Sequence, residues 1–406
     1  MTSSTKLPKT LATTAPQAEL PVAGKHRRWW HVAAEAAALF VVAIAGLELV
    51  MNACGVGLEE ILQPDPVMGV VHIPNKRVVW RMEGYSDDKF SSAGLRDVEH
   101  AIPKPADTFR IVLLGDSATE GLQVPMANTY ASFLQANYKV PGKEVEVLNF
   151  GCSSYSTGQE VLQFERQAAQ YKPDLTIALY NRGDALENVR KPGDLNCEPR
   201  PYFYMNQAGM LVQDDAVLQA NALALKPNPI ADFLRVNSRL YGVFTHANLT
   251  MSLNEPLYRK LRGWILAPFN KKRPKVDDAV NLTDSRVPQD INKVTAALLQ
   301  RLNADCRKAG GKLVVIDFPN SVNDPEYGKQ ISMISKTAKS TGFGVFDLSP
   351  KFAMYPNPKE LFVKFHFSTK GHDFVAHRII EHLNGVDEYG HHMNQFGELE
   401  TSTRAE

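Results

Sequence analysis

The stretch FRIVLLGDSATEG, from Phe109 to Gly121, decides the fold. Its first half is a continuous apolar run, which is typical of a strand buried on both faces of a parallel sheet. Ser117 follows this run at the carboxyl end of the predicted strand, where open α/β sheets bind their ligands. Gly115 permits the sharp turn out of the strand. Ser117 is therefore a candidate nucleophile, and the alternative is that it serves as a helix N-cap.

The same alternation of strand and helix continues along the chain. Further strands are predicted in EVEVLNFG at 144–151, DLTIALYN at 174–181, KLVVIDFP at 312–319 and GFGVFDL at 342–348, and helices at 130–137, 158–171, 291–311 and 368–385. This alternation predicts a parallel sheet with crossover helices, arranged as a three-layer α/β/α sandwich over residues 109–385. A stretch at about 190–288 follows neither period, and we interpret it as an insertion or cap. Residues 386–406 are expected to form a polar tail.

An apolar segment near the N-terminus predicts a membrane span. Residues 1–28 read as a disordered leader that ends in a basic cluster, and the run from Val32 to Val50 is apolar except for Glu35 and Glu48. A helix of this length covers roughly 28 Å, close to the roughly 30 Å of a bilayer core. We therefore predict one transmembrane helix at 29–53 in the lipid bilayer. A buried soluble helix is the alternative, because two glutamates in a membrane are costly.

The charges on either side of this span predict its orientation. Five basic residues precede it, and the first charges after it are acidic: Lys6, Lys9, Lys25, Arg27 and Arg28 before, then Glu59, Glu60 and Asp65. The positive-inside bias places the N-terminus in the cytoplasm and the bulk of the chain outside. Residues 58–108, dotted with proline and glycine, are predicted to be a lead-in segment that folds onto the main domain.

Composition excludes some classes of function. The 45 Lys and Arg against 44 Asp and Glu give a formal net charge of +1, so we expect no nucleic-acid partner. The four cysteines are far apart and form no CxxC motif, and the histidines lack a ligand-like spacing with carboxylates. We therefore expect neither a metal site nor a cofactor.

A histidine near the C-terminus is the candidate partner of Ser117. HFSTKGH places His366 just before the last predicted helix, with Ser368 as a plausible N-cap of that helix. The topology returns His366 to the same sheet edge as the first strand. A serine and a histidine that meet there would form a nucleophile and its general base. His372 falls within the helix, and we expect it to be structural.

Three blocks of sequence together resemble a known family. GDSATEG, NFGCSSYSTGQE and HFSTKGHDFVA are similar, in this order, to the first, second and last blocks of the SGNH (GDSL-type) hydrolase superfamily. The lead-in stretches DPVMGVVHIPN and SSAGLRD are similar to the leader of membrane-anchored bacterial members. The resemblance implies an SGNH fold, an acyl-serine mechanism with Ser117 as nucleophile and His366 as base, and the N–H groups of Ser117 and Gly151 as oxyanion donors. It also implies a single-pass protein of the bacterial inner membrane with its C-terminal domain in the periplasm.

The sequence departs from the family pattern in the third block. Its usual GND, in which an asparagine completes the oxyanion hole, is replaced by YNRGDALEN, where Asn181 is the nearest amide. Deleting one oxyanion donor costs roughly 10²- to 10³-fold in rate. Because Asn181 is the nearest amide to the missing position, it is the third candidate donor.

A second departure concerns the carboxylate that orients the histidine. The family usually has an aspartate two or three residues before it, but Val363 and Lys364 stand there. Losing this carboxylate costs around 10⁴-fold in a triad enzyme, and the charge of Lys364 would weaken the base further. A backbone carbonyl that orients His366, or the carboxylate of Asp184 or Asp347 approaching it in space, is expected to replace it.

Three functions remain open at this stage. The first is an extracytoplasmic esterase or deacylase that acts on O-acylated carbohydrate or another small ester. The second is a polysaccharide O-acetyltransferase of the same fold, in which a sugar hydroxyl replaces water as the acceptor. The third is a catalytically degenerate carbohydrate-binding or assembly protein. Water exclusion around Ser117 would favour transfer, and an open cleft would favour hydrolysis.

Overall fold

A computed structural model describes residues 24–56, 60–190, 197–224, 229–244, 290–319 and 325–385. Most of the predicted leader, much of the predicted insertion and the whole predicted tail at 386–406 lie outside the described residues. Contacts divide the chain into two compact units, Met1–Val56 and Gly57–Glu406.

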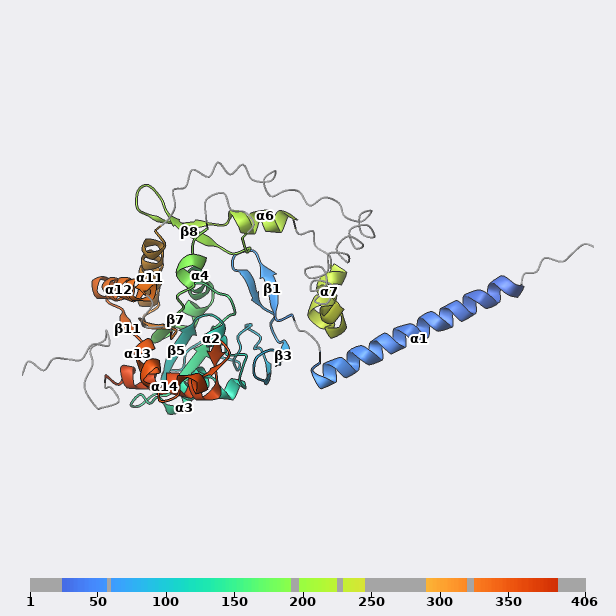
Figure 1. Cartoon of the computed structure of the whole chain (residues 1–406), viewed down its shortest axis with the longest axis horizontal. Helices are drawn as coiled ribbons and strands as arrows, with labels where there is room; N and C mark the ends of the chain where they lie inside the picture. Colours follow the sequence, from blue (N-terminus) through green and yellow to red (C-terminus); the bar gives the residue numbers. More distant parts are fainter. Residues whose placement is uncertain are drawn as a thin grey trace, which may run out of the picture. The chain divides into compact units, whose positions relative to one another are not determined.

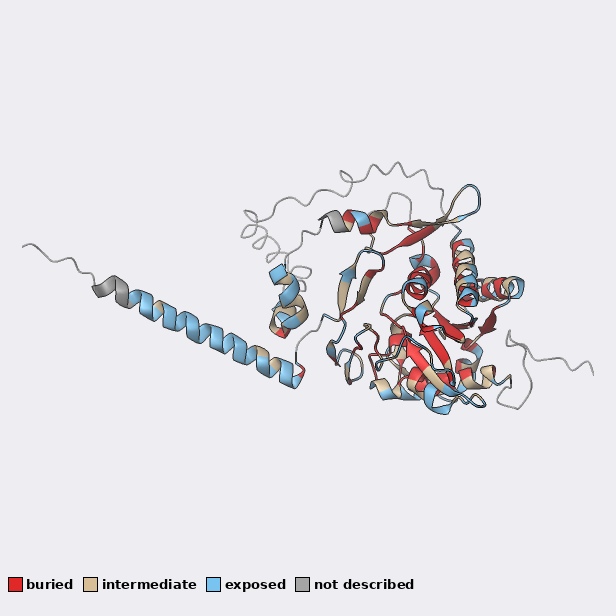
Figure 2. Cartoon of the chain, turned by 180° about the vertical axis from the view of Figure 1, so that it is seen from behind, coloured by how far each residue is buried: buried red, intermediate tan, exposed pale blue. Residues whose placement is uncertain are grey.

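The first unit contains one long helix, α1 (Gly24–Cys54). Its portion Trp29–Cys54 is long and apolar enough to cross a membrane by length and composition, a test that a signal sequence also passes. Its side chains from Trp29 onward are almost all exposed, as Figure 2 shows. A row of exposed apolar side chains needs an apolar environment, so α1 is a candidate membrane span.

The second unit is built on a parallel sheet of five strands (Figure 1). The strands are β5 (Thr108–Leu114), β6 (Glu144–Asn149), β7 (Leu175–Tyr180), β10 (Lys312–Asp317) and β11 (Gly344–Phe346), in the spatial order β11-β10-β7-β5-β6. Every neighbouring pair is parallel. The chain leaves β5 for β6 on one side and then returns to β7 on the other. The carboxyl end of β5 is therefore a topological switch point, where such sheets form their clefts.

Helices cover both faces of this sheet. Strand β5 shows the two faces directly, because Ile111 and Leu113 pack into one hydrophobic cluster while Val112 and Leu114 pack into another. The first cluster includes residues of α3 (Tyr130–Asn137), α13 (Ser349–Met354) and α14 (Thr369–Leu383), and the second includes residues of α4 (Thr157–Arg166), α11 (Ile291–Lys308) and α12 (Pro325–Thr341). The predicted α/β/α sandwich is confirmed.

Several details of the helices differ from the prediction, among them the end of α4 and the presence of α12. The helix predicted at 158–171 ends at Arg166, and Ala168–Tyr171 continues as a short 3-10 helix. Between them, Gln167 leaves helical geometry and its Nε2 donates to the carbonyl of Ala93, 2.7 Å away. Helix α12 was not predicted, although Tyr327, Gln330, Ile334 and Ala338 lie at helical spacing on its buried side.

Part of the predicted insertion packs on the core. Its described residues form the antiparallel hairpin β8 (Tyr202–Met205) and β9 (Leu211–Asp214), followed by α6 (Ala216–Ala224) and α7 (Pro229–Asn237). Phe203 is buried against Gly158 of α4, where a Cβ would lie 2.3 Å from the ring. Close contact between ring and helix backbone fixes this hairpin on α4.

The lead-in segment forms two antiparallel hairpins. These are β1 (Leu62–Asp65) with β2 (Gly69–His72), and β3 (Arg77–Trp80) with β4 (Ser86–Lys89). The buried Arg96 donates to the carbonyls of Glu120, Gly121 and Val124 at 2.9, 2.8 and 2.6 Å. These carbonyls belong to the end of the short helix that begins with Ser117 and to the loop after it. The lead-in segment therefore holds the turn that carries the candidate nucleophile.

Burial of a histidine on α14 gives a testable dependence of stability on pH. His382 stacks on Phe346 with ring centroids 4.8 Å apart, and burial lowers its pKa to about 4. Because its pKa in the unfolded chain is roughly 6.5, stability from the neutral ring is present above that pH and is lost as the pH falls towards 4. His382→Phe keeps the ring contact and removes the titration. Between pH 7 and 5 the variant should lose about 2 kcal/mol less unfolding free energy than the wild type. Urea denaturation at both pH values measures this, and equal losses would contradict it.

Candidate active site

The turn after β5 presents the hydroxyl of Ser117. Ser117 is the first residue of the short helix α2 (Ser117–Glu120), and the N-cap of this helix is Asp116, whose side chain accepts from the N–H of Ala118 at 2.9 Å. The hydroxyl of Ser117 is thus not used for capping. A Cβ at Gly115 would lie 2.1 Å from Oγ1 of Thr119, so only glycine fits the tight turn.

His366 reaches this serine from a second hairpin. It begins β13 (His366–Phe367), which pairs with β12 (Phe362–Val363), and the buried Phe367 anchors the strand in the core. Nε2 of His366 lies 2.9 Å from Oγ of Ser117. The structure therefore brings together the two residues that the sequence analysis paired, at hydrogen-bond distance.

A glutamate that the sequence analysis missed extends the contact between Ser117 and His366 into a line of three side chains. Oε2 of Glu83 lies 2.6 Å from Nδ1 of His366. A carboxylate accepts the Nδ1 proton, which leaves Nε2 unprotonated and able to accept from the hydroxyl of Ser117. The order carboxylate, imidazole, hydroxyl is the arrangement of a nucleophile, its general base and the group that orients the base.

Two hairpin tips hold Glu83 in this position. Glu83 lies in the turn between β3 and β4, and next to it Gly84 has a φ of +66° and would place a Cβ 2.0 Å from the carbonyl oxygen of Gln123. The N–H of Tyr85 donates to that same carbonyl at 3.1 Å. On the other side, Nζ of Lys364 lies 3.3 Å from the carbonyl of Met82. The turn is thus fixed both to the chain that follows α2 and to the hairpin of His366.

This geometry corrects the sequence analysis on the orienting carboxylate. Neither of the expected carboxylates contacts His366: Asp184 accepts from Oγ1 of Thr157 at 3.1 Å, and Asp347 accepts from the hydroxyl of Tyr327 at 2.5 Å. Lys364 contacts a backbone carbonyl, so the charge that we expected to weaken the base has a partner outside the imidazole. Glu83 and His366 are 283 positions apart, and no local motif links them.

Asn181 and Gly151, two of the candidate oxyanion donors, differ in what their N–H groups contact. Nδ2 of Asn181 donates to Oδ2 of Asp116 at 3.0 Å, which brings this amide beside the turn of Ser117 and leaves it a second N–H. The N–H of Gly151, in contrast, donates to Oδ1 of Asn149 at 2.9 Å. A Cβ at Gly151 would lie only 2.2 Å from the backbone nitrogen of Glu120, so this glycine is packed beneath α2. Gly151 is therefore dropped from the site.

Buried carboxyl groups lie behind the site. Burial raises the pKa of Asp116, and burial together with neighbouring carboxylates raises the pKa of Asp184 and Glu160 well above the ordinary range. A raised pKa reflects the cost of burying the charged form of a carboxyl group. His372, also buried, accepts from the N–H of Tyr130 at 3.1 Å, and burial lowers its pKa to about 3. It is a neutral structural group, as expected.

The described part of the chain contains no group of three His, Cys, Asp or Glu side chains arranged to hold a metal ion.

Fold and site together define a class of protein. A serine at the switch point of a parallel sheet, in line with an imidazole and a carboxylate, is the arrangement of a serine hydrolase. Residues 111–379 match the model of the GDSL-like Lipase/Acylhydrolase family, and the chain belongs to this family. The fold is that of the SGNH hydrolases.

Several solved structures are similar over most of their own length. They include TesA (9% identity, 66% of this chain and 95% of that chain, TM-score 0.37), the esterase EstA from Pseudoalteromonas sp. (11%, 68% and 97%, 0.35) and a catalytic mutant of the acetylxylan esterase Axe2 from Geobacillus stearothermophilus (12%, 70% and 98%, 0.36). No curated protein matches the sequence.

Proposed function

We propose that this protein hydrolyses carboxylic esters through an acyl-serine intermediate. Ser117 is the nucleophile, His366 is the general base and acid, and Glu83 is the positioning residue of His366. The observation that carries the proposal is the line of contacts from Oε2 of Glu83 to Nδ1 of His366 and from Nε2 of His366 to Oγ of Ser117, at 2.6 and 2.9 Å.

The reaction takes place in two halves. Oγ of Ser117 attacks the ester carbonyl carbon while Nε2 of His366 takes the hydroxyl proton. The tetrahedral intermediate collapses, the C–O bond to the alcohol breaks, and His366 returns the proton to the departing alkoxide. Water then attacks the acyl-serine with His366 again as base, and the carboxylic acid and Ser117 are released. Throughout, Glu83 holds the imidazole and stabilises its protonated form.

Two donors are proposed for the oxyanion. The backbone N–H of Ser117 begins α2 and has no hydrogen-bond acceptor among the described residues. The remaining N–H of Asn181 is the second donor, because its partner Asp116 directly precedes Ser117. Each donor is worth roughly 10²- to 10³-fold in rate when aimed at the developing charge.

The openness of the site supports hydrolysis as the reaction. The side chains of His366 and Glu83 remain 22% and 18% exposed, so water reaches the imidazole. Water at the base favours hydrolysis over transfer to a second alcohol, which requires its exclusion. An open site also admits an ester carried on a bulky polar molecule, and we propose O-acylated carbohydrate as the substrate class. The degenerate-scaffold alternative was motivated by the altered third block and by Lys364 in place of a carboxylate before His366. The contact between Glu83 and His366 supports a catalytic role instead.

Covalent labelling tests the proposed mechanism. A fluorophosphonate probe should label the purified protein, and mass spectrometry should place the adduct on the peptide that contains Ser117. A nucleophile activated by a neighbouring base reacts with such electrophiles, whereas ordinary serines do not. Ser117→Ala and heat-denatured protein serve as controls and should remain unlabelled. Label on another serine, or none on the native protein, would refute the assignment.

We further propose that α1 anchors the protein in the inner membrane with the hydrolase unit on the periplasmic side. Supporting this are the apolar helix Trp29–Cys54 and the basic residues before it. Carbonate extraction should leave the protein in the membrane pellet, and protease added to spheroplasts should digest the hydrolase unit. Release by carbonate would contradict the anchor, and protection from protease would contradict the orientation.

A further inference from the structure

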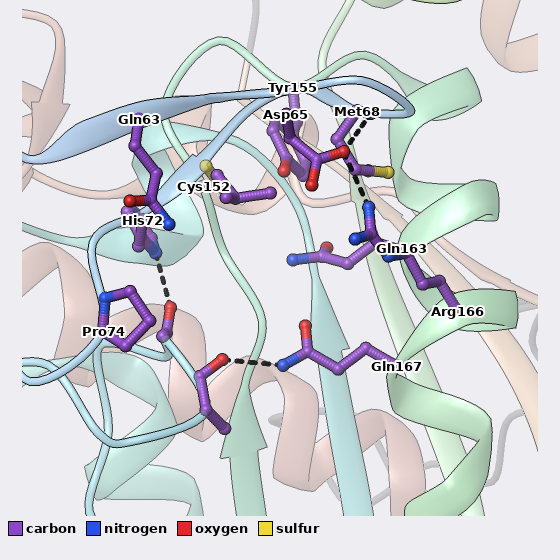
Figure 3. Close-up of a pocket in the computed structure, with 13 residues that line it drawn as sticks. Gln63, Asp65, Met68, His72, Pro74, Cys152, Tyr155, Gln163, Arg166 and Gln167 are labelled. Carbon is purple, nitrogen blue, oxygen red and sulfur yellow. Dashed lines mark hydrogen bonds and ion pairs between the residues drawn. The ribbon is translucent and has the colours of Figure 1, made fainter. Parts of the chain in front are cut away.

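A cavity of about 350 Å³ lies between the lead-in segment and helix α4, as Figure 3 shows. Its walls come from the hairpin β1–β2, from the chain around Ala93 and Gly94, from the loop after β6 and from α4. The residues that line it include neither Ser117 nor His366 nor Glu83. The cavity is therefore distinct from the proposed hydrolytic site.

Three glutamines supply the polar walls. Gln163 is only 8% exposed, its Oε1 has no hydrogen-bond partner among the described residues, and Figure 3 shows its amide pointing into the cavity. Gln167 uses Nε2 to donate to the carbonyl of Ala93, which leaves its Oε1 as an acceptor towards the cavity. Gln63 lies on the opposite wall. Oε1 of Gln163 is itself inaccessible, so the groups open to a ligand are the N–H groups of its amide and Oε1 of Gln167. Buried polar groups favour a partner that hydrogen-bonds to them, so these walls suit a hydrogen-bonding molecule.

The charged groups of the wall are already paired. Asp65 accepts from Arg166 at 2.7 Å and from the N–H groups of Met68 and Val67 at 2.8 and 2.9 Å. Nδ1 of His72 lies 2.9 Å from the carbonyl of Gly94, and its Nε2 lies 2.8 Å from Oε1 of Glu120. Both nitrogens of this ring therefore already have hydrogen-bond partners. A charged ligand would find no unpaired countercharge among these groups.

We propose that this cavity binds a neutral polyhydroxylated molecule of one or two sugar rings. A hydroxyl group both donates and accepts, which matches walls that offer amide N–H groups and amide oxygens together. An alkyl chain would bury these amides without hydrogen bonds, and an anion would find Arg166 already paired with Asp65. The volume lies at the lower end of the range for small-molecule sites, which fits a small ligand.

This site stands independently of the proposed ester hydrolysis, because it shares no residue with the hydrolytic line. The cavity is nevertheless linked to the helix that carries Ser117. His72, in the cavity wall, contacts Glu120, the last residue of that helix. A carbohydrate held here would be bound by the hydrolase unit whether or not that same molecule carries the ester.

Binding is tested on the full chain in detergent with the Ser117→Ala substitution, so that acyl chemistry plays no part. Saturation-transfer NMR and calorimetry are used with D-glucose, N-acetyl-D-glucosamine, maltose and cellobiose as neutral probes, and with D-glucuronate and octanoate as charged and apolar probes. At least one neutral sugar should bind with one site per chain, and neither D-glucuronate nor octanoate should bind.

Substitutions in the wall identify the site. Gln163→Leu should weaken binding of that sugar at least about tenfold, and Gln63→Leu, on the half-buried β1, at least about fivefold. Gln300→Leu, the same change on the exposed surface of α11, should leave binding unchanged. Circular dichroism and urea unfolding establish whether each variant is folded. If Gln163→Leu does not fold, the binding of Gln63→Leu tests the site. Absence of binding by every neutral sugar, binding unaffected by either wall substitution, or preference for glucuronate or octanoate would overturn the proposal.

Discussion

Replacing Ser117 by alanine should lower kcat/KM for p-nitrophenyl acetate by at least about 10⁴-fold. The substitution removes the atom that forms the acyl-enzyme, while the N–H donors and the binding surface remain. Initial rates with purified protein measure the loss, and unfolding in urea should show little change because the hydroxyl caps no helix.

Ser92→Ala is the matched control for this loss. Ser92 is exposed and donates to Glu99 within the lead-in segment, so its removal should change kcat/KM by less than about threefold. Residual activity of Ser117→Ala above about one tenth of the wild type would show that another group performs the chemistry.

Glu83→Gln should lower kcat/KM by about 10⁴-fold, the cost of removing the carboxylate behind a catalytic histidine. The amide keeps the shape of the side chain but cannot stabilise a protonated imidazole, and it permits the wrong tautomer of His366. The readout that separates positioning from mere structure is the fluorophosphonate labelling rate of Ser117, which should fall in parallel while the unfolding free energy changes little. Glu99→Gln, on an exposed carboxylate of the same segment, is the control.

Lys364→Asp distinguishes the structure from the sequence-based expectation. If His366 lacked a carboxylate, an aspartate at this position would supply one and raise the activity. Since Glu83 already occupies Nδ1, the only N–H on that side of the ring, an aspartate at this position adds no orienting group and should not raise kcat/KM. Loss of the contact between Lys364 and the carbonyl of Met82 should instead lower it. A gain of tenfold or more would mean that Glu83 does not orient the base.

The local sequence determined the strands of the sheet, most of its helices and the position of two chemical groups. The apolar run of β5 predicted a strand buried on both faces, and Ile111 and Val112 indeed pack on opposite faces. Ser368 caps α14 by accepting from the N–H of Gly371 at 3.1 Å, as its place in the sequence predicted. These features depend on the period of neighbouring residues and on capping, which act over a few positions of the chain. The family follows from the same blocks.

Only the tertiary structure decided how the site is completed. Glu83 meets His366 because two hairpin tips, 283 positions apart, converge beside α2, and no periodicity or motif encodes that approach. The same holds for Gly151, whose N–H is taken by Asn149, and for Gln163, whose amide faces a cavity formed with a distant hairpin. Contacts between elements depend on how entire faces pack, so a residue's partner follows from the whole fold and not from its neighbours in sequence.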